Sequence, residues 1–167
     1  MLKALSDPSP VANGEGSRIP AADFLADALE PARLAGGQLK ELADRIADID
    51  QILSWRRRGS GAPMASASFA DGHANAMIVG PGGIEERRDV WVGISLLAPE
   101  VRYPDHTHSP EEIYLVLTGS AFRQADGAWF EPGVGGTFYN EPGIVHAMAS
   151  GDKPLLAVWC LFEGRVG

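Results

Sequence analysis

The sequence is poor in cysteine and in positive charge. Its 167 residues include one cysteine, Cys160, and 14 lysine and arginine residues against 22 aspartate and glutamate residues, a formal net charge of −8. A single cysteine excludes an intrachain disulfide framework and is compatible with a reducing compartment. Phosphate binding depends on clustered lysine and arginine, so their scarcity argues against a nucleic-acid partner.

Long apolar runs are also missing. No segment is long and apolar enough to cross a membrane, and the N-terminus lacks the apolar stretch of a signal peptide. We therefore expect a cytoplasmic protein. The hydrophobic fraction of 45% over 167 residues fits one globular domain that is large enough for a real core.

The first 62 residues are predicted to form an arm and two helices. Residues 1–19 are rich in proline, glycine, serine and asparagine, and we expect them to be poorly ordered. Apolar residues recur at helical spacing from Ala21 to Glu30 and from Gln38 to Arg57. Pro31 should end the first helix, and a run of three arginines should close the second and complement its dipole. The apolar stripes must be covered, either by the rest of the chain or by a second chain in a homodimer.

Between residues 63 and 167 the pattern changes to short strands separated by turns rich in glycine and proline. The predicted strands are Ala74–Val79, Val90–Ala98, Glu112–Leu117, Ser120–Gln124, Ala128–Glu131, Thr137–Tyr139, His146–Ala149 and Leu155–Phe162. Eight short strands are typical of a jelly-roll barrel. We therefore expect one structural domain that is mainly β, with an N-terminal pair of α-helices packed on the barrel.

The chemistry is concentrated in the segment His106–Gly119, which reads His-Thr-His-Ser-Pro-Glu-Glu-Ile-Tyr-Leu-Val-Leu-Thr-Gly. Successive side chains of an extended segment point to opposite faces, so His106, His108, Glu112 and Tyr114 can share one face. Two imidazoles, a carboxylate and a phenol form a mixed set of nitrogen and oxygen donors. Such a set suits Zn, Fe, Mn, Ni or Co, and no thiolate lies nearby to favour softer metals.

A further histidine, His146, follows the turn Glu-Pro-Gly-Ile-Val and precedes the final apolar strand. It could complete the ligand shell. We predict that His106, His108, Glu112 and His146 bind one divalent transition metal, whose identity stays open among the five ions named above.

The spacing of these motifs resembles the two conserved motifs of the cupin superfamily. The order is His-x-His, three residues, Glu, six residues and Gly, followed by a Pro-Gly turn and a lone His. The resemblance covers about Val90 to Glu163 and implies the cupin double-stranded β-helix. Three positions depart from the usual motifs: Glu100 replaces a glycine, the spacing from Pro142 to His146 is one residue short, and Ser150 replaces an asparagine. These departures lie in turns and leave the ligand positions intact.

A longer stretch carries a more specific resemblance. It runs Tyr103-Pro-Asp-His-Thr-His-Ser-Pro-Glu-Glu-Ile-Tyr-Leu-Val-Leu-Thr-Gly, with Pro142-Gly-Ile-Val-His-Ala-Met downstream, and is similar to the cupin-type dimethylsulfoniopropionate (DMSP) lyases of marine bacteria. The resemblance implies β-elimination of DMSP to dimethyl sulfide and acrylate at a divalent metal, with Tyr114 as the base. A free phenol has a pKa of about 10, so such a base needs a nearby cation.

A sulfonium substrate carries a fixed positive charge, which favours an aromatic wall that attracts cations. The candidate wall residues are Tyr103, Trp91 and Trp159, and Tyr103 is the second candidate for a catalytic tyrosine. Both tryptophans lie in apolar strands, so we expect at least one of them to be a core residue. His73 and Glu111 fall outside the shared face, and we expect them to be surface or hydrogen-bonded residues.

Fold alone does not define a reaction, so two alternatives remain. One is a metal-dependent cupin enzyme of other chemistry, either a dioxygenase or a lyase that acts on another small carboxylate. The other is a non-catalytic sensor cupin, which usually accompanies a DNA-binding domain; the few basic residues make this the weaker alternative.

Overall fold

The structure, a computed structural model, describes residue 11 and residues 15–58 and 64–162. The arm expected over residues 1–19 lies largely outside the described residues, and so does the boundary expected between residues 62 and 63. The helical elements are η2 (Pro20–Phe24), α1 (Leu25–Ala35), α2 (Gly37–Ile49), η3 (Asp50–Ile52) and α3 (Phe69–Gly72). The strands are β1 (His73–Val79), β2 (Val90–Leu97), β3 (Arg102–His106), β4 (Glu111–Val116), β5 (Ala121–Gln124), β6 (Thr137–Asn140), β7 (His146–Ala149) and β8 (Leu155–Phe162).

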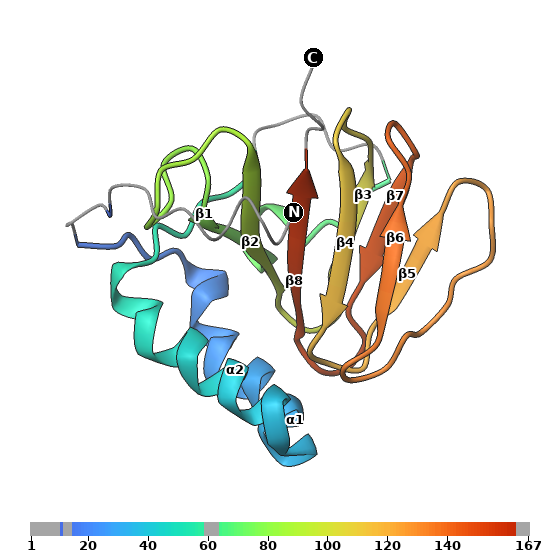
Figure 1. Ribbon diagram of the computed structural model, residues 1–167. Coiled ribbons are helices and arrows are strands. Elements are labelled where there is room, and N and C mark those ends of the chain that lie inside the picture. Colours follow the sequence, from blue (N-terminus) through green and yellow to red (C-terminus); the bar gives the residue numbers. More distant parts are fainter. Residues whose placement is uncertain (1–10, 12–14, 59–63, 163–167) are drawn as a thin grey trace.

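The strands form two antiparallel sheets. The larger sheet has the order β1-β2-β8-β4-β6, and the smaller has the order β3-β7-β5. Figure 1 shows the smaller sheet behind the β4–β6 side of the larger one, with the helix pair on the opposite side of the molecule. Apart from β1 and β2, neighbouring strands are not consecutive in the sequence, and β8 inserts between β2 and β4. The expected mainly β fold with an N-terminal helix pair is confirmed.

Strand alternation divides the apolar side chains of the larger sheet between two cores. Ile94, Leu96 and Leu156 pack with the helices, whereas Leu97 and Leu155 pack between the two sheets. All five are fully buried. Because neighbouring residues of a strand face opposite sides, one sheet can hold the helix pair on one face and close the barrel with the other.

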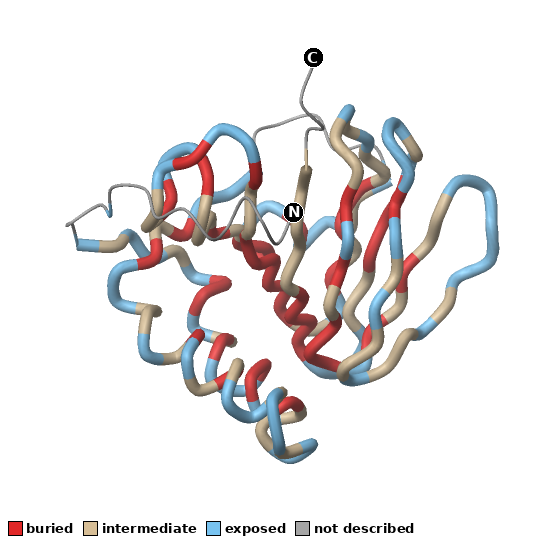
Figure 2. The backbone as a smooth tube through the Cα atoms, in the orientation of Figure 1, coloured by how far each residue is buried: buried red, intermediate tan, exposed pale blue. Residues whose placement is uncertain are grey.

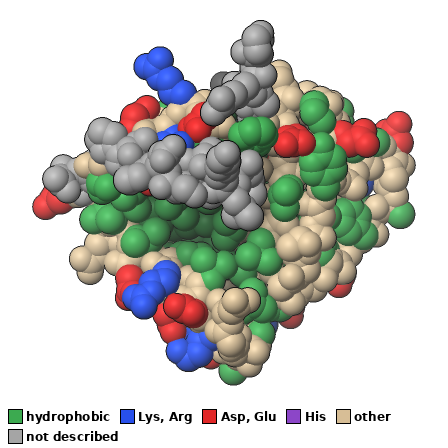
Figure 3. Space-filling view, viewed as in Figure 1, with side chains coloured by type: hydrophobic (Ala, Val, Ile, Leu, Met, Phe, Trp, Pro, Cys, Tyr) green, Lys and Arg blue, Asp and Glu red, His purple; other side chains and the backbone are tan. Residues whose placement is uncertain are grey.

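The helix pair covers the outer face of the larger sheet. Leu29 and Ile46 are buried in the same core as the sheet residues, with Leu42 and Ile49 packed against it. The apolar stripe of the helices is therefore covered within the chain, as the buried inner sides of the helices in Figure 2 show. On the face drawn in Figure 3, hydrophobic side chains gather between the helices and the sheet, and charged side chains lie on the outer helix surface.

Both helix ends differ from the sequence prediction. Pro31 does not end α1, which continues to Ala35 with the proline inside it. A proline removes one backbone hydrogen bond, but Ala32 in the last turn is fully buried, so packing outweighs that loss. The chain leaves the helix at Gly36, whose φ of 74° favours glycine.

The second helix ends at Ile49, well before the arginines expected to close it. Beyond η3 the chain becomes extended, because Leu53 and Trp55 are buried in the core and the Trp55 indole donates to Asp50 Oδ1 at 2.9 Å. Arg56 then pairs through its backbone with Asn75 of β1. The interpretation of the arginine run as a helix end is therefore wrong.

Two strand assignments are also corrected. The sequence analysis missed β3, which contains Pro104. A proline is tolerated there because β3 is an edge strand and its register with β7 is irregular between Tyr103 and His106. The predicted strand Ala128–Glu131 is wrong, because that segment makes only an isolated bridge between Phe130 and Phe122.

No helix in the described part of the chain has the length and apolar character needed to cross a lipid bilayer.

Gly93 on β2 makes room for the Trp159 indole on β8, so a side chain there should destabilise the fold. In Gly93→Ala the new methyl would lie 2.3 Å from Trp159 Cζ2 and 2.7 Å from the Ala76 carbonyl oxygen. We expect the free energy of unfolding to fall by about 1–3 kcal/mol, measured by denaturant titration. Gly119→Ala is the matched control, because its methyl would meet no heavy atom within 4 Å. Equal stability of the two variants would contradict the prediction.

Candidate functional site

Three of the predicted metal ligands converge at one end of the barrel. His108 follows β3, Glu112 lies on β4 and His146 begins β7, so the group draws on both sheets. Their potential ligand atoms all lie within 4.8 Å of one another. Glu112 Oε2 is 3.3 Å from His108 Nε2 and 3.2 Å from His146 Nε2. We call His108, Glu112 and His146 the ligand group.

His106, the fourth predicted ligand, lies beside this group. It pairs with His146 across β3 and β7, and the two ring centroids are 4.0 Å apart. Its nitrogens are not among the ligand atoms that lie within 4.8 Å of one another. Burial, together with the neighbouring His146, lowers the pKa of His106 to about 3. The ring is therefore neutral, the form in which imidazole binds metals.

The three histidine rings are oriented by the same kind of backbone contact. Nδ1 of His106, His108 and His146 each lies 2.9–3.1 Å from a backbone carbonyl oxygen two residues away. A carbonyl oxygen can only accept a hydrogen bond, so Nδ1 carries the proton in each ring. In the neutral form of each ring Nε2 is then left with a lone pair, which is how metal-binding histidines are commonly held. A proton on His108 Nε2 would instead be donated to Glu112 Oε2.

His146 Nε2 supports the fit of a cation. The atom is buried and has no hydrogen-bond partner in the described part of the chain, although Glu112 Oε2 lies only 3.2 Å away. The two atoms lack hydrogen-bond geometry, and both present lone pairs when the His146 ring is neutral. A buried contact of this kind is unfavourable unless a proton or a cation neutralises it. The donor set therefore fits a divalent metal.

Glu112 is held as a carboxylate. Burial alone would raise its pKa, but contacts with His108, His146 and Asn140 outweigh burial and lower the pKa to about 2. In return, the contact with Glu112 raises the pKa of His108. A proton shared with His108 and a divalent cation are thus alternative ways of balancing the same buried negative charge.

A cavity of about 190 Å³ adjoins the ligand group. Its lining residues are Arg58, Asn75, Ser95, Tyr103, His106, His108, Glu112, Tyr114, Met148, Trp159 and Leu161. Three of the four predicted ligands therefore line the cavity, and His146 does not. Both predicted tyrosines and Trp159 also line it. Trp91 does not line it; its indole lies beside Gly80, near the β1–β2 turn.

Tyr114 is buried in the wall of this cavity. Its ring stacks on Phe138 at a centroid distance of 5.0 Å. Burial, and then the nearby Glu112 carboxylate, raise the pKa of Tyr114 well above that of a free phenol. Tyr103 is held differently, because Asn75 Nδ2 donates to its hydroxyl at 3.2 Å.

Arg58 is a lining residue that the sequence analysis did not identify. Its guanidinium lies 5.7 Å from the centre of the Tyr103 ring, and it is the single lysine or arginine among the described lining residues. Its backbone N–H donates to Nε2 of the buried His73 at 2.7 Å. His73 Nδ1 contacts the Phe69 carbonyl oxygen, so His73 is a hydrogen-bonded residue, as expected.

The comparison with protein families concerns nearly the whole chain. Residues 1–157 match the model of the dimethylsulfoniopropionate lyase family. The chain belongs to this family.

Two curated proteins are similar to this family member. A Cereibacter sphaeroides protein with the provisional name dimethylsulfoniopropionate lyase DddL is 30% identical over 117 residues, which are 70% of this chain and 48% of that protein. Dimethylsulfoniopropionate lyase DddQ of Ruegeria pomeroyi is 28% identical over 120 residues, which are 70% of this chain and 58% of that protein. The chain spans about half the length of the curated relatives it matches.

Solved structures show the same fold. The crystal structure of DMSP lyase DddQ from Ruegeria pomeroyi has a TM-score of 0.76 at 24% identity, covering 96% of this chain and 79% of that one. A structure from the pair of DMSP lyases RdDddP and RnDddQII has a TM-score of 0.75 at 21% identity, covering 99% and 85%. A cupin-2 domain from Rhodospirillum rubrum has a TM-score of 0.52 at 8% identity, covering 69% and 72%. The expected cupin barrel is confirmed.

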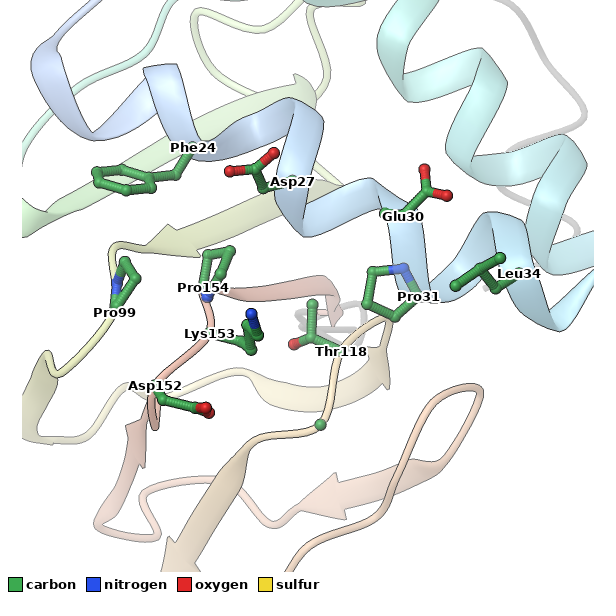
Figure 4. Close-up of a pocket in the computed structure, with 11 residues that line it drawn as sticks. Phe24, Asp27, Glu30, Pro31, Leu34, Pro99, Thr118, Asp152, Lys153 and Pro154 are labelled. Carbon is green, nitrogen blue, oxygen red and sulfur yellow. The ribbon is translucent and has the colours of Figure 1, made fainter.

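A larger cavity of about 580 Å³ lies away from the ligand group, between α1 and the turns at the other end of the barrel. Figure 4 shows Asp27 and Glu30 on the helix side, and Thr118 and Lys153 on the turns below. Among the residues that the structure describes, no histidine or cysteine lines it. The ligand group adjoins the smaller cavity and not this larger one.

Removing one ligand should weaken metal binding without unfolding the protein. We expect the wild-type protein to bind about one Co²⁺ or Zn²⁺ ion per chain, and Glu112→Gln to bind it at least roughly 100-fold more weakly, because the amide lacks the charge that attracts the cation. His106→Ala should also weaken binding if His106 is a ligand. Titration of metal-free protein against a competing chelator measures both. A wild-type protein that binds no ion would show the ligand prediction to be wrong.

Proposed function

We propose that this protein is a metal-dependent lyase that cleaves DMSP to dimethyl sulfide and acrylate by β-elimination, with Tyr114 as the base. The observation that carries the proposal is that the ligand group and two tyrosines adjoin one small cavity in a DMSP lyase family member. The cavity, at about 190 Å³, is smaller than typical pockets for drug-sized ligands and suits a compact substrate.

His108, Glu112 and His146 would hold the divalent ion, with His106 as the fourth ligand. When bound, the ion supplies a Lewis acid that binds a carboxylate and stabilises negative charge next to it. Three imidazole nitrogens and one carboxylate can bind Zn, Fe, Mn, Ni or Co, so the donor types alone do not define the metal.

The rest of the cavity would orient a substrate that is positive at one end and negative at the other. Tyr103 and Trp159 present aromatic surface, to which the sulfonium methyl groups are attracted by up to about 2 kcal/mol. Arg58 would attract the carboxylate end, and because its guanidinium lies 5.7 Å from the centre of the Tyr103 ring, it would repel a sulfonium from that part of the wall. Trp159 is therefore the wall residue that would receive the sulfonium end.

Tyr114 would take the proton from the carbon next to the carboxylate. The electron pair of the broken carbon–hydrogen bond forms the double bond of acrylate, and the carbon–sulfur bond breaks with its electrons remaining on sulfur. The sulfonium thereby leaves as neutral dimethyl sulfide, and the proton passes from the tyrosine to solvent. Burial opposes ionisation of Tyr114, so the phenolate requires the positive charge of the loaded site.

Tyr114→Phe tests the assignment of the base. The change removes only the hydroxyl, so the ring still stacks on Phe138 and metal content should be kept. We expect release of dimethyl sulfide, measured in the headspace over metal-loaded protein, to fall by roughly 10²-fold or more, as for loss of a general base.

Tyr103→Phe is the matched control. If it abolishes turnover with the metal retained and Tyr114→Phe does not, the roles of the two tyrosines are reversed. Oxygen uptake without dimethyl sulfide release would indicate a dioxygenase instead, and release of another product from a related small carboxylate would show that the substrate is not DMSP.

A further inference from the structure

A chain of hydrogen bonds leads from the backbone of β6 to Glu112. Gln124 Nε2 donates to the Tyr139 carbonyl oxygen at 2.5 Å and to Asn140 Oδ1 at 2.7 Å. Asn140 Nδ2 in turn donates to Glu112 Oε2 at 2.8 Å. The predicted site residues do not include Gln124 or Asn140.

The direction of this chain is fixed by its first member. A backbone carbonyl oxygen only accepts, so the amide nitrogen of Gln124 must face Tyr139. That nitrogen then also faces Asn140, whose oxygen must accept. Asn140 is left with its amide nitrogen toward Glu112, which must accept in turn. Each side-chain amide has one orientation, and Glu112 is met by a donor rather than by a second oxygen.

Sheet register explains why these residues meet at the ligand group. Asn140 on β6 lies directly across from Glu112 on β4, in the larger sheet. Gln124 on β5 lies directly across from His146 on β7, in the smaller sheet. The contact between Gln124 and Asn140 therefore joins the two sheets beside the ligands that each sheet contributes.

The hydrogen bond between Asn140 and Glu112 is buried, so its loss would not be compensated by water. Asn140 is fully buried and Glu112 is 3% exposed, so no bulk water is available to replace a lost partner. A buried charged group that loses a hydrogen bond retains its desolvation cost, and its side chain is free to rotate away. Removing Asn140 would take from Glu112 the amide donor that fixes its orientation, and leave the carboxylate beside the two histidines and Tyr114.

We propose that Asn140 and Gln124 are positioning residues of the metal centre, which hold the Glu112 carboxylate in the orientation that binds the ion. Asn140 acts on Glu112 directly, and Gln124 acts by fixing Asn140. The proposal rests on the metal site of the proposed function. It assigns to these two amides a part in metal affinity that is separate from catalysis.

Metal affinity of the metal-free chain is the readout. Asn140→Leu and Gln124→Met keep side-chain size and remove the hydrogen bonds. We expect the Kd for Co²⁺, from chelator competition, to rise roughly 10- to 100-fold in Asn140→Leu, as for loss of an outer partner of a metal ligand. Gln124→Met should give a smaller rise in the same direction, and both should alter the Co²⁺ absorption spectrum.

Asn75→Leu is the matched control. Asn75 also lines the cavity, but it contacts Tyr103 and Ser95 rather than a ligand. We expect its Kd for Co²⁺ to equal that of the wild type. A general loss of packing around the cavity would instead weaken binding in all three variants.

A double variant separates positioning from a merely structural role. Because Gln124 acts through Asn140, adding Gln124→Met to Asn140→Leu should cause no further rise in Kd. Additive effects, or an unchanged Kd in Gln124→Met, would overturn the proposal. Gln124 is only partly buried, so its variant decides the question even if Asn140→Leu fails to fold. Absence of binding by the wild type would refute the metal site itself, whereas wild-type binding with unchanged variants would refute only the positioning role.

Discussion

A buried carboxylate is the constraint on which the site depends. Glu112 is 3% exposed, and a negative charge in such a place must be balanced by donors or cations close to it. Asn140 supplies a hydrogen-bond donor from the larger sheet, and His146 of the smaller sheet supplies a second potential ligand atom for a cation beside the carboxylate. A barrel of two facing sheets is suited to this task because its inner faces present side chains to a common point.

The same constraint explains the electrostatics of the neighbours. Glu112 raises the pKa of His108 on one side and contributes to the raised pKa of Tyr114 on the other. An added cation would reverse both effects, since it would replace the proton on His108 and favour the phenolate of Tyr114. Acid–base behaviour in this cavity is thus tied to the charge state of one carboxylate.

Sequence reasoning succeeded where a local rule determines structure. Alternation along an extended segment predicted that Glu112 and Tyr114 share a face, and both line the cavity. Sequence reasoning failed where contacts between residues far apart in the sequence determine the structure. The burial of Ala32 allows α1 to continue beyond Pro31, and no local sequence pattern indicates that this residue is buried. Asn140 reaches Glu112 through strand register, a pairing set by the whole sheet.

Arg58 gives the N-terminal segment a significance beyond covering the sheet. The residue precedes the barrel in the sequence, yet its side chain lines the cavity, and its backbone is tied to His73 at the start of β1. A barrel transplanted without that segment would keep every histidine and Glu112 but lose the positive charge at the cavity wall. The positive charge at the cavity wall therefore depends on a segment outside the barrel, and replacing that segment would change the charge that lines the cavity.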